Sequence, residues 1–170
     1  MTTLFKTISP ESLDDNFFSR IDNDWMLITA GTLTRFNTMT ASWGTLGILW
    51  NKPIAICFIR PQRFTFKFAE EHNFYTLTFL DEKYRDILNF CGSHSGKDTD
   101  KVAKTGLLPV ALGAESITFE QARLVFDCRK LYADFIKPGN FIVRDIIDKN
   151  YPKQDFHRFY IGEIINCFRR

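Results

Sequence analysis

Three short segments combine residue types that could hold a small polar or anionic ligand. The first places hydroxyl, amide and small side chains between two apolar stretches: Asn37, Thr38, Met39, Thr40, Ala41, Ser42 and Trp43. Such a loop presents backbone N–H groups and short donors, which suit a planar polar heterocycle or a phosphate. The alternative is a turn whose Ser and Thr side chains bond only to nearby backbone.

The second segment carries two arginines beside an expected helix start. Arg60 and Arg63 follow an apolar stretch, and we expect Thr65 to cap a helix that runs to about His72. Two guanidinium groups at a helix N-terminus can bind a phosphate through charge, forked hydrogen bonds and the helix dipole. The alternative is a pair of surface arginines beside an ordinary N-cap.

The third segment is a polar loop with a glycine and several cations, and its candidate ligand residues are Ser95, Gly96, Lys97 and Lys101. A hydroxyl and cations on a flexible loop could contact an anion. The alternative is a solvated loop that leads into a short helix, capped by Asp98 or Asp100 and closed by Gly106.

Other signatures of catalysis are missing from the sequence. No G-x-G-x-x-G or G-x-S-x-G motif occurs, and the segment 92–98 departs from a P-loop because Asp98 stands where Ser or Thr should bind magnesium. Three histidines and four cysteines are scattered, so we expect no metal site. The net charge of +2 does not favour a nucleic-acid partner.

The cysteines and the apolar stretches indicate where in the cell the protein is expected. The four cysteines lack paired spacing, and three lie in apolar stretches, which predicts buried free thiols rather than disulfides. The N-terminus has no apolar signal region, and no uninterrupted apolar stretch approaches ~18 residues. We therefore expect a soluble, cytoplasmic protein that does not enter a membrane.

The elements that must position these segments are mainly strands. We expect one domain over 1–170, with a helical lead-in at 1–23 that includes a helix from Pro10 to about Ser19. Apolar alternation and turn residues predict strands at 25–29, 75–79, 117–128, 141–147 and 159–168, and two more within 42–59. A helix is expected from Asp81 to a left-handed Gly92. This pattern favours a β-barrel with inserted short helices over a doubly wound sheet.

Some of these elements carry finer expectations. The strand at 25–29 should break at Gly31, and the strand at 75–79 should be half buried because Tyr75, Leu77 and Phe79 alternate with threonines. A change of apolar face near 120–121 predicts a β-bulge there.

The order of the motifs resembles a known family. N-T-M-T-x-S-W is followed about twenty residues later by R-P-x-R-x-T, then by S-G-K-D-x-D-K and Gly106-Leu107, and finally by H-R-F-Y-I-G-E-I from His157 to Ile164. This order is similar to that of the flavin reductase-like proteins with an FMN-binding split barrel, most closely the flavoredoxin branch. The resemblance runs from about Asp24 to Ile165.

The resemblance implies a homodimeric split β-barrel with one FMN per subunit near the dimer interface. Residues 37–43 would line the isoalloxazine ring and the ribityl chain. The phosphate would be surrounded by Arg60, Arg63 and Thr65, with Ser95, Gly96 and Lys101 as further candidates. Lys97 occupies a position where the family often has another cation, and His157 is a candidate catalytic residue.

We therefore expect an FMN-dependent oxidoreductase that reduces flavin or another acceptor with NADH or NADPH. One alternative is an electron carrier that takes its electrons from a redox protein. Another is a β-barrel that binds a ligand or nucleic acid without redox chemistry, which the small net charge and the Phe-rich, Tyr-poor composition argue against. The aromatic content of 15% fits a large subunit interface or a Phe-packed core equally well.

Overall fold

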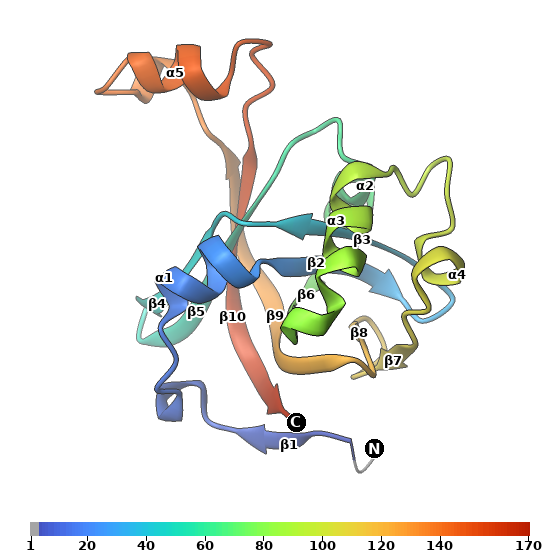
Figure 1. Ribbon diagram of the computed structural model, residues 1–170. Coiled ribbons are helices and arrows are strands. Elements are labelled where there is room, and N and C mark those ends of the chain that lie inside the picture. Colours follow the sequence, from blue (N-terminus) through green and yellow to red (C-terminus); the bar gives the residue numbers. More distant parts are fainter. Residues whose placement is uncertain (1–3) are drawn as a thin grey trace.

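A strongly curved antiparallel sheet forms the body of the protein (Figure 1), seen in a computed structural model that describes residues 4–170. Seven strands follow the order β3-β2-β6-β9-β10-β5-β4, and β1 pairs with the free part of β10. Their bounds are β1 (Lys6–Ile8), β2 (Met26–Thr32), β3 (Arg35–Ala41), β4 (Gly44–Leu49), β5 (Lys52–Ile59), β6 (Phe74–Leu80), β9 (Ala122–Phe135) and β10 (Arg158–Arg169). A separate small sheet pairs β7 (Pro109–Ala111) with β8 (Ile117–Phe119).

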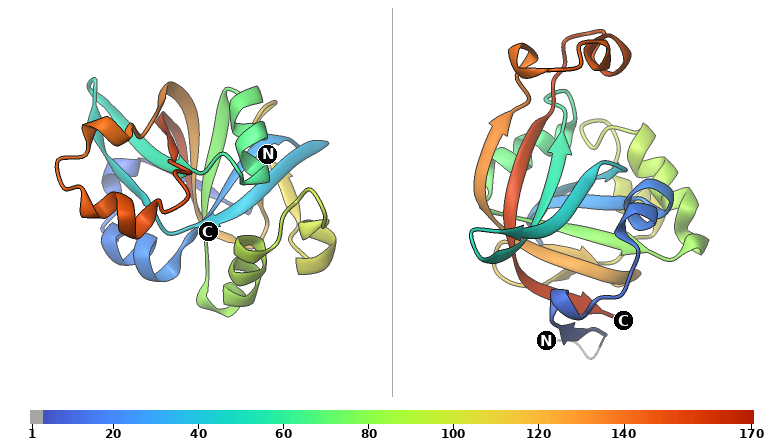
Figure 2. Two further views of the ribbon diagram at one scale, coloured as in Figure 1. Left: turned by 90° about the horizontal axis from the view of Figure 1, so that it is seen from above. Right: turned by 90° about the vertical axis from the view of Figure 1, so that its left-hand side faces the viewer.

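Short helices are inserted between the strands. They are α1 (Phe17–Ser19), α2 (Phe64–Glu71), α3 (Arg85–Ser93), α4 (Lys101–Thr105) and α5 (Asp145–Asn150). α2 and α3 pack against β2 and β3 (Figures 1 and 2). The expected mainly β fold with inserted helices is confirmed. Within residues 4–170, no helix is long and apolar enough to cross a membrane.

The core lies inside the curve of the sheet. Met26, Ile28, Leu77, Phe79 and Phe126 are fully or almost fully buried there. All four cysteines are buried and free, so the expectation of buried thiols is confirmed.

The expected half-burial of β6 is wrong. The two threonines on its other face are also fully buried, because β8 covers them. Thr76 Oγ1 donates to the carbonyl of Ile117 at 2.6 Å, and the Thr78 hydroxyl lies 2.9 Å from that of Thr118. Alternation of polar and apolar residues therefore marks two different buried faces here.

The N-terminal lead-in is not one helix to Ser19. A 3₁₀ turn at Pro10–Ser12 ends at Leu13, whose backbone is extended with φ −76° and ψ 130°. A new helical segment then starts at Asn16, whose side chain accepts a hydrogen bond from the Ser19 amide. The Asn16 cap favours a new helix start there over continuation of the Pro10–Ser12 turn.

The break expected at Gly31 does not occur, because β2 continues to Thr32. Gly31 has φ +123°, and a Cβ there would lie 2.3 Å from the carbonyl oxygen of Arg35. The absence of a side chain lets β2 approach β3 closely at the hairpin without ending the ladder.

The face change at 120–121 is a turn rather than a bulge. Glu120 and Gln121 connect β8 of the small sheet to β9 of the large sheet. A register shift does occur nearby, between Phe79 and Leu80 of β6, opposite the start of β9.

Two helix boundaries differ from expectation. Arg63 is the N-cap of α2, so Thr65 lies inside the first turn. Gly92 lies within α3 rather than after it in a left-handed conformation. The cap of α4 is as predicted, since the Asp100 carboxylate accepts from the Ala103 amide and Gly106 has φ +70°.

The strand expected at 141–147 is absent. The chain between β9 and β10, residues 136–157, instead forms an arm that projects from the ends of these strands and carries α5 (Figures 1 and 2). In the part of the chain that the structure describes, no strand lies beside this segment to pair with it. Its apolar residues Ile142, Val143 and Ile146 are exposed, with Ile142 94% exposed.

Candidate functional site

The second and third motifs meet in one small pocket of about 140 Å³. The loop between β5 and α2 supplies Arg63 and Thr65, the loop after α3 supplies Ser95 and Gly96, and α4 begins with Lys101. We call this the anion pocket. α2 begins at its wall, and the amides of Phe64 and Thr65 have no intrahelical carbonyl partner, whereas the Phe66 amide donates to the Arg63 carbonyl at 2.8 Å.

Two cations converge on the C-terminal end of α3 in this pocket. Lys101 is only 5% exposed, and its Nζ donates to the carbonyls of Thr38 at 2.8 Å and Cys91 at 2.9 Å. Arg63 Nη2 donates to the same Cys91 carbonyl at 3.4 Å. Within residues 4–170, neither cation has a carboxylate partner within ion-pair distance.

Burial weakens the charged forms of both side chains. It lowers the pKa of Lys101 to about 8, and the nearby Arg63 charge lowers it further. Burial likewise lowers the pKa of Arg63. Two like charges held together without a counter-charge are stabilised by a bound anion, so the donor set fits a phosphate group.

Asn37 supports the anion pocket from behind. Its Nδ2 donates to Thr65 Oγ1 at 2.7 Å, and a Cβ on Gly96 would lie 1.9 Å from its Oδ1. Only glycine permits this approach. Thr38 is buried as well, with its hydroxyl 2.8 Å from that of Thr29, so it contributes its carbonyl rather than its side chain.

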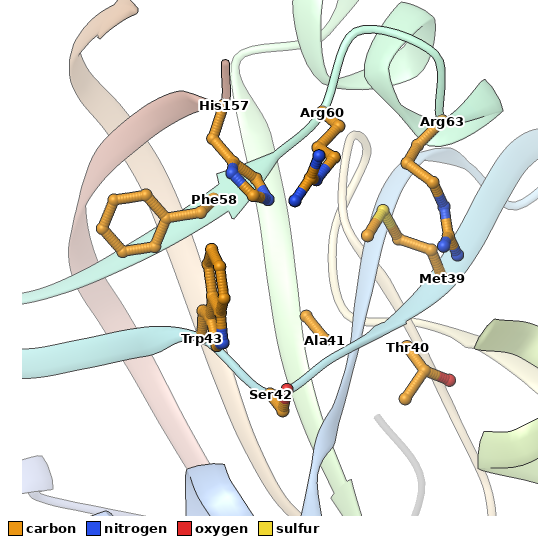
Figure 3. A pocket seen from close by; sticks show the side chains of 9 residues that line it. All are labelled: Met39, Thr40, Ala41, Ser42, Trp43, Phe58, Arg60, Arg63 and His157. Carbon is orange, nitrogen blue, oxygen red and sulfur yellow. The ribbon is translucent and has the colours of Figure 1, made fainter. Parts of the chain in front are cut away.

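A larger cavity of about 280 Å³ opens at the base of the arm (Figure 3), and we call it the aromatic cavity. It is lined by Met39, Thr40, Ala41, Ser42, Trp43, Phe58, Arg60, Arg63 and His157. Trp43, Phe58 and His157 gather at one end and Arg63 lies at the other. The ring centroids of Trp43 and His157 are 5.0 Å apart, and those of Phe58 and His157 are 6.3 Å apart.

His157 is held by the arm. It is 8% exposed, and its Nδ1 lies 3.0 Å from the hydroxyl of Tyr151. Burial, followed by the Arg60 charge, lowers the pKa of His157 to about 4. The imidazole is therefore uncharged at neutral pH.

Arg60 also faces the arm, away from the anion pocket. Its Nη1 donates to the Asp155 carboxylate, and its Nη2 donates to the Asn150 carbonyl at 2.8 Å. The guanidinium carbon lies 5.2 Å from the centroid of the Tyr151 ring. Arg60 thus has a carboxylate partner, whereas Arg63 has none among residues 4–170.

A third cavity of about 360 Å³ joins the two sites. It shares Arg63, Gly92 and Ser93 with the anion pocket, and Thr40, Ala41, Ser42 and Arg63 with the aromatic cavity. The three spaces form one groove along the end of β3, cationic at one end and aromatic at the other.

The sequence did not reveal every residue of this groove. Phe58, Tyr151 and Asp155 were missed because each lies in a stretch without a recognisable motif, and only the fold brings them beside His157. Lys97 was included, yet it is exposed and lines neither the anion pocket nor the aromatic cavity. Its amide donates to Ser95 Oγ at 3.2 Å.

Fold and groove together define a curved β-sheet protein that can take an elongated ligand with one anionic end and one flat end. The family model described as flavin reductase like domain matches residues 18–169, so the chain belongs to the flavin reductase-like domain family. The family resemblance expected from the motifs is confirmed. Comparison with curated protein sequences gives no match.

Solved structures of similar fold include flavoredoxin from Methanosarcina acetivorans, with 18% identity, a TM-score of 0.65, and coverage of 86% of this chain and 68% of that one. A putative flavin reductase with a split barrel domain from Shewanella frigidimarina NCIMB 400 has 19% identity, a TM-score of 0.64 and coverage of 95% and 79%. A putative flavin reductase from Haemophilus somnus 129PT has 12% identity, a TM-score of 0.68 and coverage of 96% and 90%. These neighbours confirm the expected split-barrel fold.

Proposed function

We propose that this protein is a flavoprotein that binds FMN without a covalent bond and acts as an NADH- or NADPH-dependent oxidoreductase. The observation that carries the proposal is the buried pair Arg63 and Lys101, which lacks a carboxylate partner within residues 4–170. A phosphate monoester supplies the missing negative charge. When bound, FMN supplies the hydride and electron transfer chemistry, so the protein needs no nucleophile of its own.

Most of the candidate residues have a role in this proposal. Arg63, Lys101 and the first amides of α2 bind the phosphate, with Thr65, Ser95 and Gly96 completing the anion pocket. Residues 39–43 line the ring and the ribityl chain, while Asn37 and Thr38 hold the pocket walls. Arg60 bonds to Asp155 and Asn150 of the arm rather than to the phosphate, and Lys97 lies outside the anion pocket.

The aromatic cavity is the proposed place where a second molecule reaches the ring. Trp43 is 43% exposed at this end, so a planar reactant can enter beside it. His157 lies against Trp43 and can donate a hydrogen bond to that reactant. Two of the solved structures of similar fold are named as putative flavin reductases and one as a flavoredoxin, which supports a redox role for this chain as well.

We also propose a homodimer in the cytoplasm. The exposed apolar residues of the arm, and Ile48 and Trp50 of the β4–β5 hairpin, support an interface with a second subunit. Four buried free thiols suit a reducing compartment.

The first experiment is an absorbance titration of the purified protein with FMN, followed by NADH or NADPH. We expect a flavin band that shifts on binding and is bleached by the nicotinamide. A band without bleaching would favour the electron-carrier alternative, and no spectral change on adding FMN would contradict flavin binding.

A matched pair of arginine variants tests the phosphate assignment. Arg63→Ala should weaken FMN binding by ~1.5–3 kcal/mol, roughly ten- to a hundredfold, because a charge-assisted hydrogen bond is lost. Arg60→Ala should change the dissociation constant by less than about threefold, since its charge is already compensated by Asp155. Equal effects of the two variants would contradict the assignment.

A further inference from the structure

Lys101 lines two cavities at once. One is the anion pocket, and the other is a larger cavity of about 440 Å³ between the start of β3 and α4, which we call the β3 cavity. Phe36, Thr99 and Val102 also line the β3 cavity. Because Lys101 is only 5% exposed, a small molecule reaches its amine through these cavities rather than from the open surface.

Two hydrogen bonds determine how the Lys101 amine is oriented. Nζ donates to the carbonyls of Thr38 at 2.8 Å and Cys91 at 2.9 Å, which occupies two of its three donor positions. In the neutral amine the third position is the lone pair, which then points away from both carbonyls. No other group within residues 4–170 bonds to Nζ, so this lone pair is free to react.

The Lys101 amine is neutral far more often than the amine of an ordinary lysine. Burial lowers its pKa to about 8, so about a tenth of the side chains are neutral at pH 7. An exposed lysine with a pKa of about 10.4 is neutral in fewer than roughly one molecule in a thousand. Only the neutral amine can attack a carbonyl carbon, so Lys101 is a candidate nucleophile.

The other donors of the anion pocket select the kind of molecule that can react with Lys101. Arg63 and the amides of Phe64 and Thr65 can bind a phosphate group without help from Lys101. In an acyl phosphate, the phosphate is joined to a carbonyl carbon through one oxygen atom. The anion pocket of about 140 Å³ is small, so an acyl phosphate that docks there has its carbonyl carbon close to Nζ.

Docking of the phosphate has two opposing effects on this reaction. Its negative charge favours the ammonium form of Lys101, which reduces the neutral fraction by roughly ten- to a hundredfold. Docking also replaces a chance collision with a fixed neighbour, and the effective molarity of such well-oriented groups reaches about 10⁵ M. The gain from proximity therefore exceeds the loss of neutral amine.

We propose that Lys101 is acylated by acyl phosphates that dock in the anion pocket, and that the modification then blocks phosphate binding there. The Nζ lone pair forms a bond to the acyl carbonyl carbon, the bond from that carbon to the bridging oxygen breaks, and one Nζ proton passes to the departing phosphate. The product is an uncharged amide with a single N–H donor, and the β3 cavity offers space for its acyl group. The inference rests on the anion pocket of the proposed function and adds a regulatory modification to it.

Acetyl phosphate and the native protein without FMN provide the direct test. After incubation at pH 7.5, mass spectrometry of peptides should show that Lys101 is acetylated at least about tenfold faster than Lys104 and Lys130. Lys104 is an exposed lysine of the same helix. Lys130 is half-buried and has a pKa that burial also lowers, but it lines neither cavity. Equal or slower acetylation of Lys101 would overturn the inference.

A second reagent separates phosphate docking from simple reactivity. The N-hydroxysuccinimide ester of acetic acid carries no phosphate, and it should acetylate the exposed Lys104 faster than Lys101. Arg63→Ala should slow acetylation of Lys101 by acetyl phosphate at least about tenfold, because a charge-assisted contact to the phosphate is lost. It should not slow the reaction with the ester, because loss of the Arg63 charge favours the neutral amine. Arg60→Ala should leave the rates within about threefold of the native values, and equal effects of Arg63→Ala on both reagents would contradict docking.

The modification should also change ligand binding. Inorganic phosphate should protect Lys101 from acetyl phosphate, because both occupy the anion pocket. Acetylated protein, and Lys101→Gln as its mimic, should bind FMN at least about tenfold more weakly than the native protein. Lys104→Gln is the control, and it should leave FMN affinity within about threefold of the native value. Native FMN affinity in the acetylated protein would contradict the regulatory role.

These experiments fail separately from the proposed function, because acetylation of Lys101 is measured without FMN. If Lys101 reacts selectively but the protein does not bind FMN, the proposed function fails and the modification site stands. If FMN binds and Lys101 does not react selectively, the modification site fails alone.

Discussion

Lys101 combines deep burial with a lowered pKa and two carbonyl partners. Its ammonium donates hydrogen bonds to the carbonyls of Thr38 and Cys91, yet these dipoles do not replace a counter-charge. Such a lysine responds to pH in a range where ordinary lysines do not. The anion pocket should therefore bind its ligand in a pH-dependent way.

Because the Lys101 pKa is about 8 without ligand, the side chain is charged below that pH and neutral above it. A bound phosphate favours the charged form, so FMN binding above this pKa requires uptake of a proton. FMN affinity should fall as pH rises from about 8 to 9.5, by up to about tenfold per unit. Flavin fluorescence titrations at several pH values measure this change in FMN affinity.

Lys101→Met is the control for this pH dependence. The variant should bind FMN more weakly at neutral pH, and its affinity should be flatter between about pH 8 and 9.5, because the titrating group is gone. Parallel pH curves for the native protein and Lys101→Met would contradict the assignment to Lys101.

The candidate site was predictable from sequence only in part. Arg63 and Lys101 belong to motifs whose order carries information, and the fold brings them together. The different directions of Arg60 and Arg63 were not predictable, because they depend on Asp155, which lies 95 residues from Arg60. A partner at that separation leaves no local pattern.

At the scale of elements, the sharpest local constraint lies in the β2–β3 hairpin. Gly31→Ala would place a Cβ 2.3 Å from the Arg35 carbonyl oxygen at φ +123°. We expect a loss of at least ~2 kcal/mol in the free energy of unfolding, because strain and a backbone clash add. Urea denaturation measures this loss.

Gly47 provides a matched comparison on β4. A Cβ there meets no atom within 4 Å, so Gly47→Ala should change the free energy of unfolding by less than ~1 kcal/mol. Similar midpoints and slopes for the two variants would show that the hairpin relaxes without cost.

The elements that sequence predicted correctly are those with a local cause. β10 follows from apolar residues in a long extended run, and α4 follows from its Asp100 cap and its left-handed Gly106. The segment 141–147 has apolar residues typical of a strand, but a strand needs a neighbour, and the arm has no neighbouring strand within residues 4–170. Tertiary pairing, which short-range patterns do not encode, explains this error.

At the scale of the whole molecule, the arm presents apolar side chains that its own barrel leaves uncovered. Ile142 is 94% exposed, so changing it should not disturb the folded chain. If the proposed homodimer uses the arm, Ile142→Asp should weaken dimerisation by at least about tenfold, since it places a charge in an apolar contact. Sedimentation equilibrium measures the dissociation constant.

Lys153→Asp is the control for the dimer, because it introduces the same acidic side chain at an exposed polar position of the arm. It should leave the dissociation constant within about threefold of the native value. A monomeric native protein, or equal effects of the two variants, would contradict an arm-mediated dimer.

The position of β10 between β9 and β5 has a consequence for biosynthesis. β10 follows every other strand in the chain, yet it joins β6 and β9 on one side to β5 and β4 on the other, and it also pairs with β1. As the ribosome releases the chain, the earlier strands of the large sheet can form only two separate pieces, β3-β2-β6-β9 and β5-β4. Closure of the barrel must wait until β10 has left the exit tunnel. A nonsense mutation before Arg158 therefore leaves the edges of β9 and β5 unpaired, and chaperones and proteases can bind these exposed edges.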